Sequence, residues 1–286
     1  MKIKLATILK YGGGLLFLCI IGFIYLEVKS PTDLRRFRRT DHAFSKDLPV
    51  PPSRKGLDHL YISGSARISQ PSLQKAIGDI DKAIYVVDLL GEPHCFIQGL
   101  PARWYGYKPD QLIANTPGKL GFFHIRHMLR RLLRTGKLHH TNQDAQTEKE
   151  MIEQAGYHYI QANFTRGDAP SNDQVDQLIK DLQGIPEGSW VHFHCSAGQG
   201  RTTIAMAMYD ILKNSKNVSL EDIIKRQYSL GGVDLFDTVV WPNGTYTKEA
   251  LENRSSFITK FYQYVTDPNG LNSTSWKEWI RVNNNT

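Results

Sequence analysis

Residues 194–203 read His-Cys-Ser-Ala-Gly-Gln-Gly-Arg-Thr-Thr, and this stretch decides how the rest of the chain is interpreted. Cys195 and Arg201 are separated by five residues, two of which are glycine. A cysteine offers a sulfur nucleophile, and an arginine offers a planar fork that binds two phosphate oxygens at once. Glycines let the backbone curve so that its N–H groups face a phosphate. The spacing predicts a loop that binds and attacks a phosphate ester, with backbone contacts from Ser196, Ala197, Gly198, Gln199 and Gly200.

The residues on either side of this loop predict a strand before it and a helix after it. Residues 190–194 form a short, mostly apolar run after a glycine, and residues 202–214 carry apolar residues at helical spacing. A loop between a strand end and a helix start lies in a positive field, which binds anions and lowers the pKa of a thiol. We therefore expect Cys195 to be a reactive thiolate that accepts a hydrogen bond from Thr202 or Thr203.

The composition is that of an ordinary globular enzyme. The chain has 286 residues, of which 41% are hydrophobic and 22% are charged. A formal net charge of +7 favours anionic partners such as phosphates or a membrane surface. No nucleic-acid-binding signature accompanies that charge, so we expect no nucleic-acid partner. We also expect no cofactor.

The cysteines and histidines do not form a metal-binding pattern. Only three cysteines are present and no Cys-x-x-Cys occurs, so we expect neither a disulfide framework nor a metal site. Cys95 is predicted to be a buried apolar residue, and the alternative is a regulatory disulfide between Cys95 and Cys195. His192 and His194 lie on the same face of the predicted strand, and we expect one of them to orient the loop backbone. For His192 we favour a packed core residue.

The N-terminus has the pattern of a targeting segment. Three lysines, at positions 2, 4 and 10, precede an apolar run over 12–26. A basic start followed by an apolar core is typical of export signals, and counted from residue 5 the run is long enough to span a membrane. Because no cleavage site with small residues follows, we predict an uncleaved signal anchor over 1–28, with a cleaved signal peptide as the alternative. The protein is therefore expected to be membrane-anchored or exported, with its catalytic domain outside the cytoplasm.

Residues 29–56 are rich in charge and proline and are predicted to be a linker. The catalytic domain is then expected over 57–286. Four arginines within the linker form a basic cluster that tends to stay cytoplasmic or contacts anionic lipid headgroups: Arg35, Arg36, Arg38 and Arg39.

Within the catalytic domain, predicted strands alternate with predicted helices. Strands are expected over 84–89, 157–162 and 190–194, and helices over 147–155 and 172–182, the second capped by Ser171. This alternation predicts an α/β fold with a mostly parallel sheet flanked by helices. The Cys195 loop then lies at the carboxyl end of a strand, where such sheets bind ligands.

Cleavage of a phosphate ester also needs an acid that protonates the leaving oxygen. The loop 165–171 follows a predicted strand, and Asp168 is the only carboxylate in it. We predict that Asp168 is this acid and that its loop closes over the substrate. The alternative is a surface aspartate near the start of a helix.

The segment 195–201 resembles the signature of the cysteine-dependent protein-tyrosine-phosphatase superfamily. Further segments resemble, more narrowly, the tyrosine-phosphatase-like phytases, which are bacterial inositol polyphosphate phosphatases. The resemblance extends over about 57–281 and is carried by residues 63–69, 87–94, 100–106, 147–156, 190–203, 226–227, 231–232 and 261–265.

This resemblance implies a tyrosine-phosphatase-like core with a mostly parallel central sheet and a small β-rich addition. It also implies a metal-independent reaction through a cysteinyl-phosphate intermediate, in which an aspartic acid protonates the leaving alcohol and water then releases phosphate. Cys195, Arg201, Asp168 and Thr202 would be the catalytic residues. Candidate phosphate contacts beyond the loop are Glu92, His94 and Arg166.

The chain departs from the family pattern in three segments. In the loop 165–171, Arg166 stands where the family has its acid, and Asp168 comes two residues later. Leu90 and Pro93 replace an arginine and a serine, and residues 235–246 lack the family's lysines. A basic cluster over 126–140 could contact phosphates, a membrane or only solvent. We expect inositol polyphosphates or phosphoinositides as substrates. The alternatives are phosphoproteins, which would make the chain a protein-tyrosine or dual-specificity phosphatase, and a catalytically weak phosphate-binding module.

Overall fold

The structure is a computed structural model that describes residues 34–92, 94–97, 100–103, 145–240 and 246–283. Its central sheet has five strands in the order β1-β2-β8-β3-β7. The pairs β2–β8, β8–β3 and β3–β7 are parallel, and only the edge strand β1 runs antiparallel to its neighbour. The predicted α/β fold with a mostly parallel sheet is therefore confirmed. The strands are β1 (Arg38–Arg39), β2 (Ile62–Ser65), β3 (Ile84–Asp88), β7 (His158–Gln161) and β8 (Trp190–His194).

A second, antiparallel sheet lies beside the carboxyl end of β3. It contains β4 (His94–Ile97), β5 (Leu100–Arg103) and β6 (Ala145–Gln146), in the order β5-β4-β6. This sheet is the small β-rich addition that the family resemblance implied. The basic cluster predicted over 126–140 lies outside the described residues.

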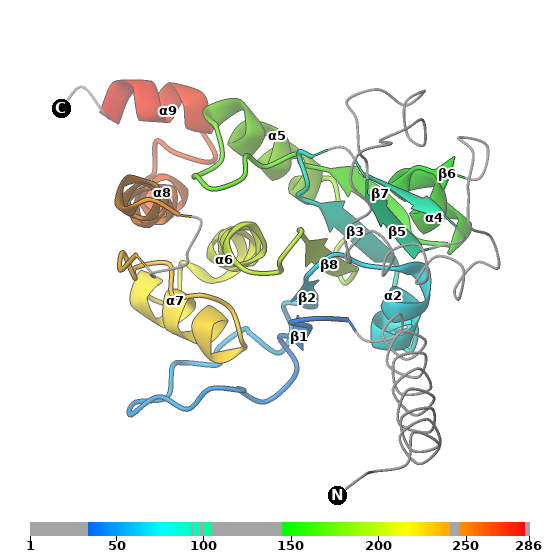
Figure 1. Ribbon diagram of the computed structural model, residues 1–286. Coiled ribbons are helices and arrows are strands. Elements are labelled where there is room, and N and C mark those ends of the chain that lie inside the picture. Colours follow the sequence, from blue (N-terminus) through cyan, green and yellow to red (C-terminus); the bar gives the residue numbers. More distant parts are fainter. Residues whose placement is uncertain (1–33, 93, 98–99, 104–144, 241–245, 284–286) are drawn as a thin grey trace, which may run out of the picture.

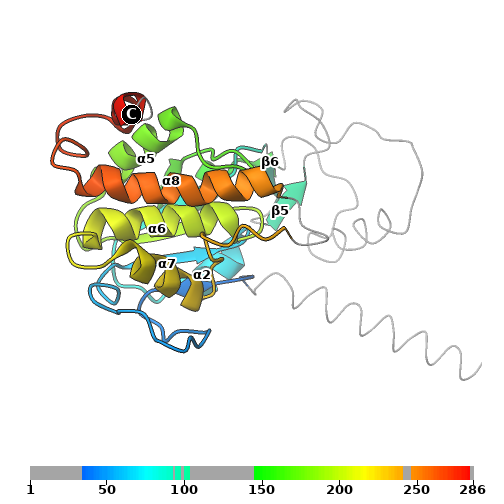
Figure 2. The same cartoon turned by 90° about the vertical axis from the view of Figure 1, so that its left-hand side faces the viewer.

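Helices cover both faces of the central sheet (Figure 1). The view in Figure 2 shows α6, α7 and α8 running side by side on one face. Helices α2 and α4 pack on the opposite face together with the first residues of β3 and β8. The helices are α2 (Gln70–Ile77), α4 (Glu148–Gln154), α5 (Asn172–Gln183), α6 (Gly200–Asn214), α7 (Leu220–Ser229), α8 (Lys248–Thr266) and α9 (Trp276–Asn283).

The two faces of the sheet bury two separate hydrophobic cores because successive strand side chains point to opposite sides. In β8, Val191 and Phe193 enter the large core under α5 to α9, whereas Trp190 enters the smaller core under α2 and α4. In β3, Val87 enters the large core and Val86 enters the smaller core. The sheet is therefore covered on both sides, as expected for parallel strands.

Helix α6 is the buried centre of the large core. All of its residues from Gly200 to Ile211 are buried. Near its C-terminal end it carries a buried charge, Asp210, which forms an ion pair with Arg226 of α7. The helix begins two residues earlier than predicted, so Arg201 lies in its first turn, next to the N-terminus that attracts anions.

The N-terminal part of the described chain belongs to the folded domain. Residues 34–56 were predicted as part of a linker, but β1 pairs with β2, and Arg38 and Thr40 are buried. The domain therefore begins before residue 57.

Within the described ranges, no helix has both the length and the apolar character needed to cross a bilayer. The predicted anchor over 1–28 lies outside those ranges.

Candidate active site

The loop after β8 wraps around the sulfur of Cys195. The side chain is only 3% exposed. Its Sγ accepts hydrogen bonds from Thr202 Oγ1 at 3.1 Å and from the backbone N–H of Gly198 at 3.2 Å. The predicted hydrogen bond from Thr202 is thus confirmed. Thr203 instead receives a hydrogen bond from Arg38 and donates none to the sulfur.

Gly198 is required by the shape of this loop. Its φ of +70° is in the left-handed region, which costs other residues energy. A Cβ at this position would lie 2.4 Å from the backbone nitrogen of Ala66, in the segment after β2. Only glycine therefore lets the loop pass so close to that backbone.

The surroundings of Cys195 favour its thiolate. Burial alone would raise the pKa of the thiol. The hydrogen bond from Thr202, the charge of Arg201 and the backbone N–H groups of Ala197 and Gly198 outweigh burial and lower that pKa. The thiolate is the nucleophilic form of a cysteine, so these contacts favour the reactive form of Cys195.

The guanidinium of Arg201 is held by a carboxylate and two carbonyls. Its Nη1 lies 2.8 Å from Glu92 Oε2, and its Nη2 lies 3.0 Å from Glu92 Oε1. Nη1 also donates to the carbonyls of Leu89 and Phe164, each at 3.2 Å. Three of these four hydrogen bonds come from Nη1 and one comes from Nη2. The Nε–H has no partner among the described residues, so the edge of the guanidinium formed by Nε and Nη2 is available for a phosphate.

Glu92 is placed beside Arg201 rather than against the sulfur. Burial would raise the pKa of Glu92, but the hydrogen bond and charge of Arg201, together with the charge of Arg166, lower it. Arg166 is exposed and close enough to Glu92 to act on its carboxylate. The structure therefore brings two of the predicted phosphate contacts, Glu92 and Arg166, to one side of the loop.

Asp168 lies on an exposed loop. Its Oδ1 accepts hydrogen bonds from the backbone N–H of Ala169 at 2.7 Å and from Asn253 Nδ2 of α8 at 3.4 Å. Neither bond involves Cys195 or Arg201. The role of Asp168 as the acid thus remains a prediction that requires its loop to close.

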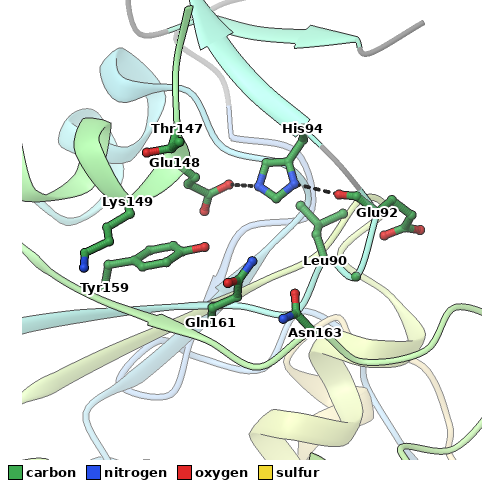
Figure 3. A pocket seen from close by; sticks show the side chains of 10 residues that line it. Leu90, Glu92, His94, Thr147, Glu148, Lys149, Tyr159, Gln161 and Asn163 are labelled. Carbon is green, nitrogen blue, oxygen red and sulfur yellow. Dashed lines mark hydrogen bonds and ion pairs between the residues drawn. The ribbon is translucent and has the colours of Figure 1, made fainter. Parts of the chain in front are cut away.

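His94 belongs to a buried cluster of ionisable side chains next to the loop (Figure 3). Its Nε2 lies 2.7 Å from Glu148 and 3.2 Å from Asp88, and its Nδ1 lies 2.8 Å from the carbonyl of Glu92. His194, directly before Cys195, forms an ion pair with the other oxygen of Glu148 at 2.5 Å. Both nitrogens of His94 are occupied by protein acceptors, so the predicted phosphate contact would have to replace one of them.

Charge pairing explains the protonation states in this cluster. Burial opposes the charged forms, but the carboxylates of Asp88 and Glu148 raise the pKa of His94 to about 10. The two imidazoles in turn lower the pKa of Glu148 to about 2. Donor atoms of Asp88, His94 and Glu148 lie within 4.8 Å of one another, which is the arrangement of a possible divalent-metal site. In the structure the same atoms neutralise each other as ion pairs.

This cluster borders a cavity of about 710 Å³ that opens beside Glu92. Figure 3 shows His94 and Glu148 on one side and Gln161 and Asn163 on another. Lys149 adds a positive charge to the lining. The cavity therefore offers room next to Glu92 for the part of a ligand beyond one phosphate.

His192 is a packed core residue, as predicted. Its Nδ1 lies 2.8 Å from Ser63 Oγ and its Nε2 lies 3.0 Å from Ser65 Oγ. Trp190 Nε1 donates to Ser63 Oγ, and Ser65 Oγ donates to the carbonyl of Ala66. Because the Ser65 hydroxyl donates to Ala66, Ser65 Oγ accepts from Nε2–H of His192, and Nδ1 accepts from the Ser63 hydroxyl. His192 is therefore a neutral imidazole that carries its proton on Nε2. Burial first, and then the nearby positive charges, keep the pKa of His192 low.

Two arginines at the site were not predicted. Arg36 donates to the carbonyl of Ala197 at 2.7 Å, and Arg38 donates to the carbonyl of Gly198 at 2.8 Å. Both lie in the stretch 29–56 that is predicted to be a linker, because nothing near them in the sequence indicates burial. Their contacts arise only when β1 pairs with β2, which brings them under a loop that is about 160 residues away in the chain.

A cysteine inside an anion-binding loop, between a parallel strand and the start of a helix, defines the class of cysteine-dependent phosphatases. Comparisons with known proteins narrow this class. Residues 126–213 match the family model of the PTP-like phytases, whose description is inositol hexakisphosphate. The PTP-like phytase from Bdellovibrio bacteriovorus is 33% identical, with 87% of this chain and 90% of that one covered and a TM-score of 0.60. The chain belongs to the PTP-like phytase family.

Two longer relatives match the same region. The PTP-like myo-inositol phosphatase from Mitsuokella multacida, in complex with myo-inositol-(1,3,4,5)-tetrakisphosphate, is 32% identical with a TM-score of 0.67, covering 88% of this chain and 47% of that one. The effector protein hopD2 of Pseudomonas syringae pv. tomato is 30% identical over 267 residues, covering 85% of this chain and 56% of the relative. The chain thus spans about half the length of these two proteins.

Proposed function

We propose that the protein hydrolyses phosphate monoesters by transferring the phosphoryl group to Cys195. The observation that carries this proposal is the setting of the sulfur. A thiol that is 3% exposed accepts hydrogen bonds from Thr202 and Gly198, and its pKa is lowered. A purely structural cysteine needs none of these donors.

The proposed reaction has two steps. In the first, the thiolate attacks phosphorus, the S–P bond forms, and the P–O bond to the leaving alcohol breaks. Asp168 gives its proton to that leaving oxygen once its loop has closed. In the second step, water gives a proton to the Asp168 carboxylate as its oxygen bonds to phosphorus, and the S–P bond breaks. The departing thiolate is stabilised by the hydrogen bond from Thr202. Arg201 binds the phosphoryl oxygens through its Nε edge in both steps.

We further propose inositol polyphosphates or phosphoinositide headgroups as the substrates. The chemistry beside Cys195 suits a ligand with several phosphates, because Arg166 and Lys149 are positive and the cavity next to Glu92 has about 710 Å³. The Mitsuokella relative binds an inositol tetrakisphosphate. Leu90 and the lysine-free stretch 235–246 remove positive charge that the family pattern has, so we propose a less highly phosphorylated ring than inositol hexakisphosphate.

Phosphate release by the full-length protein tests this proposal. The assay compares inositol hexakisphosphate, inositol tetrakisphosphate, phosphoinositides in mixed micelles and phosphotyrosine peptides, with Cys195→Ser as the control. We expect the inositol compounds to be hydrolysed fastest and Cys195→Ser to be inactive. Faster release from phosphotyrosine peptides would instead favour a protein phosphatase. Phosphate binding without release from any compound would favour a binding module.

We propose in addition that residues 1–28 attach the protein to a membrane or direct its export. The support is the basic and apolar pattern of these residues alone. Fractionation of cells that produce the full chain or a chain lacking 1–28 tests it. Equal distribution of the two chains between the soluble and membrane fractions, with no export of either, would contradict it.

A further inference from the structure

Arg38 is a buried cation beneath the phosphate-binding loop. Its side chain extends from β1 and is 3% exposed. Nη1 donates to the carbonyl of Gly198 at 2.8 Å and to the carbonyl of Arg36 at 3.2 Å, and Nη2 donates to Thr203 Oγ1 at 3.2 Å. A buried arginine is costly unless its charge is compensated. Within the described part of the chain no carboxylate pairs with it.

The charge that compensates Arg38 is at the active site. Burial lowers the pKa of Arg38 to about 10, and the charge of Cys195 acts in the opposite direction. Arg38 therefore stays protonated at neutral pH. A cation kept under the loop in this way favours the thiolate of Cys195 and any phosphate bound above it.

Arg36 contacts the preceding carbonyl of the loop, that of Ala197, at 2.7 Å. Its own backbone has a φ of 53°, in the left-handed region, which is strained for a residue other than glycine. Such strain persists only where the surrounding contacts hold the residue in place. The turn at Arg36 is what brings both arginine side chains to the same loop.

The geometry of the peptide bond shows what these two contacts do. In a planar trans peptide the C=O and the following N–H point in opposite directions. Holding the carbonyl of Ala197 away from the site turns the N–H of Gly198 inward, and this N–H does donate to Sγ at 3.2 Å. Holding the carbonyl of Gly198 outward in the same way turns the N–H of Gln199 toward the phosphate position.

We propose that Arg36 and Arg38 are positioning residues of the phosphate-binding loop. Their guanidinium groups hold the carbonyls of Ala197 and Gly198 outward, so that the N–H groups of Gly198 and Gln199 face the sulfur and the bound phosphate. This role rests on the proposed function of the loop. Charged donors also polarise the peptides they bind, which makes the inward N–H groups stronger donors.

The reactivity of the Cys195 thiol tests the proposal without any need for turnover. The full-length protein is alkylated with iodoacetamide across a pH series, with and without inorganic phosphate, and the Cys195 peptide is quantified by mass spectrometry. The charged and titratable groups that face Cys195 and its loop, and that remain unchanged in the Arg38 variants, are Arg36, Glu92, His192, His194, Arg201 and Tyr246.

Arg38→Met should move the midpoint of alkylation up by about one pH unit, because it removes a nearby positive charge. It should also raise the phosphate concentration needed for protection about tenfold, because it removes a charge-assisted hydrogen bond. Arg38→Lys should leave the pH midpoint of alkylation close to that of the wild type, since lysine keeps the positive charge. It should still lose much of the protection by phosphate, since lysine lacks the planar fork of arginine.

Arg35→Met is the matched control, since Arg35 is an exposed neighbour whose side chain makes no hydrogen bond or ion pair among the described residues. Equal alkylation profiles and equal phosphate protection in Arg38→Met and Arg35→Met, both folded by circular dichroism, would overturn the proposal. If Arg38→Met does not fold, phosphate protection is measured instead in Arg36→Met, which changes an exposed residue. Weaker phosphate protection in Arg36→Met supports the proposal, and unchanged protection overturns it.

Discussion

Glu92 and Arg201 face each other through two parallel contacts, from Oε2 to Nη1 at 2.8 Å and from Oε1 to Nη2 at 3.0 Å. The pair joins the loop after β3 to the first turn of α6. A fork-to-fork pair fixes the plane of the guanidinium as well as its position. Arg201 is therefore oriented for phosphate before any ligand arrives.

Glu92→Gln should lower kcat/KM about tenfold, because an amide offers Arg201 one acceptor and no charge, and a hydrogen bond to a charged group contributes about 1.5–3 kcal/mol. Steady-state phosphate release measures this. Glu278→Gln, which breaks an exposed ion pair with Arg281, is the control and should leave kcat/KM unchanged. Equal values for the two variants would show that the orientation of Arg201 does not depend on Glu92.

Gly198→Ala should abolish phosphate binding at the loop while the chain still folds. The new Cβ would lie 2.4 Å from the backbone nitrogen of Ala66, so the loop has to shift. Gly188→Ala is a close control, because its φ of +80° carries the same backbone cost but nothing lies within 4 Å of the added carbon. Isothermal titration with inorganic phosphate compares the two. Similar phosphate affinities would mean that the loop tolerates the added methyl group.

Asp168→Asn should slow the hydrolysis of alkyl phosphates by about 10²–10⁴-fold, the usual contribution of a general acid. It should slow p-nitrophenyl phosphate much less, because that leaving group needs no proton. The ratio of the two rates is the measurement. Asp173→Asn, an exposed aspartate at the start of α5, is the control. An unchanged ratio in Asp168→Asn would assign the acid to another group.

Glu148→Gln should destabilise the fold by about 3–5 kcal/mol near pH 6, because it leaves two buried imidazolium groups with Asp88 as their one remaining carboxylate partner among the described residues. In the wild type, Glu148 stabilises above its ordinary pKa of 4.5 and loses this effect as the pH falls toward 2. His94 stabilises below its ordinary pKa of 6.5 and loses this effect as the pH rises through about 10. The deficit of the variant should therefore shrink between pH 6 and pH 10.

Urea unfolding at several pH values measures that deficit. Glu153→Gln removes an exposed glutamate from the same helix and should have little effect at any pH. If Glu148→Gln and Glu153→Gln unfold at the same urea concentration at pH 6, the buried ion pairs do not stabilise the fold.

Local features of the fold could be predicted from the sequence because they depend on neighbouring residues. The cap of α5 by Ser171 is confirmed, since it needs only the next few residues. The strand and helix around Cys195 were predicted for the same reason. Helix α6 begins two residues earlier than its apolar spacing predicts, because its first residue, Gly200, is a poor helix former.

The contacts that complete the site could not be predicted in this way. Arg38 and Gly198 are 160 residues apart, and Glu92 and Arg201 are 109 residues apart. Each pair forms only through the order of strands in the sheet, which hydrophobic periodicity does not specify. His94 shows the same limit. The sequence indicates it as a site residue, but it does not indicate its buried partner Glu148, which lies on α4.

The position of β8 has a consequence for when the nucleophile becomes reactive. This strand lies between β2 and β3, and His192 meets Ser63 across 129 residues of chain. Pairing between such distant segments forms late in folding. Until it forms, the sheet does not hold the Gly198 N–H and the Thr202 hydroxyl in place against the sulfur. Completing the fold is therefore what lowers the pKa of the Cys195 thiol, and a chain that has not yet folded has an ordinary cysteine at this position.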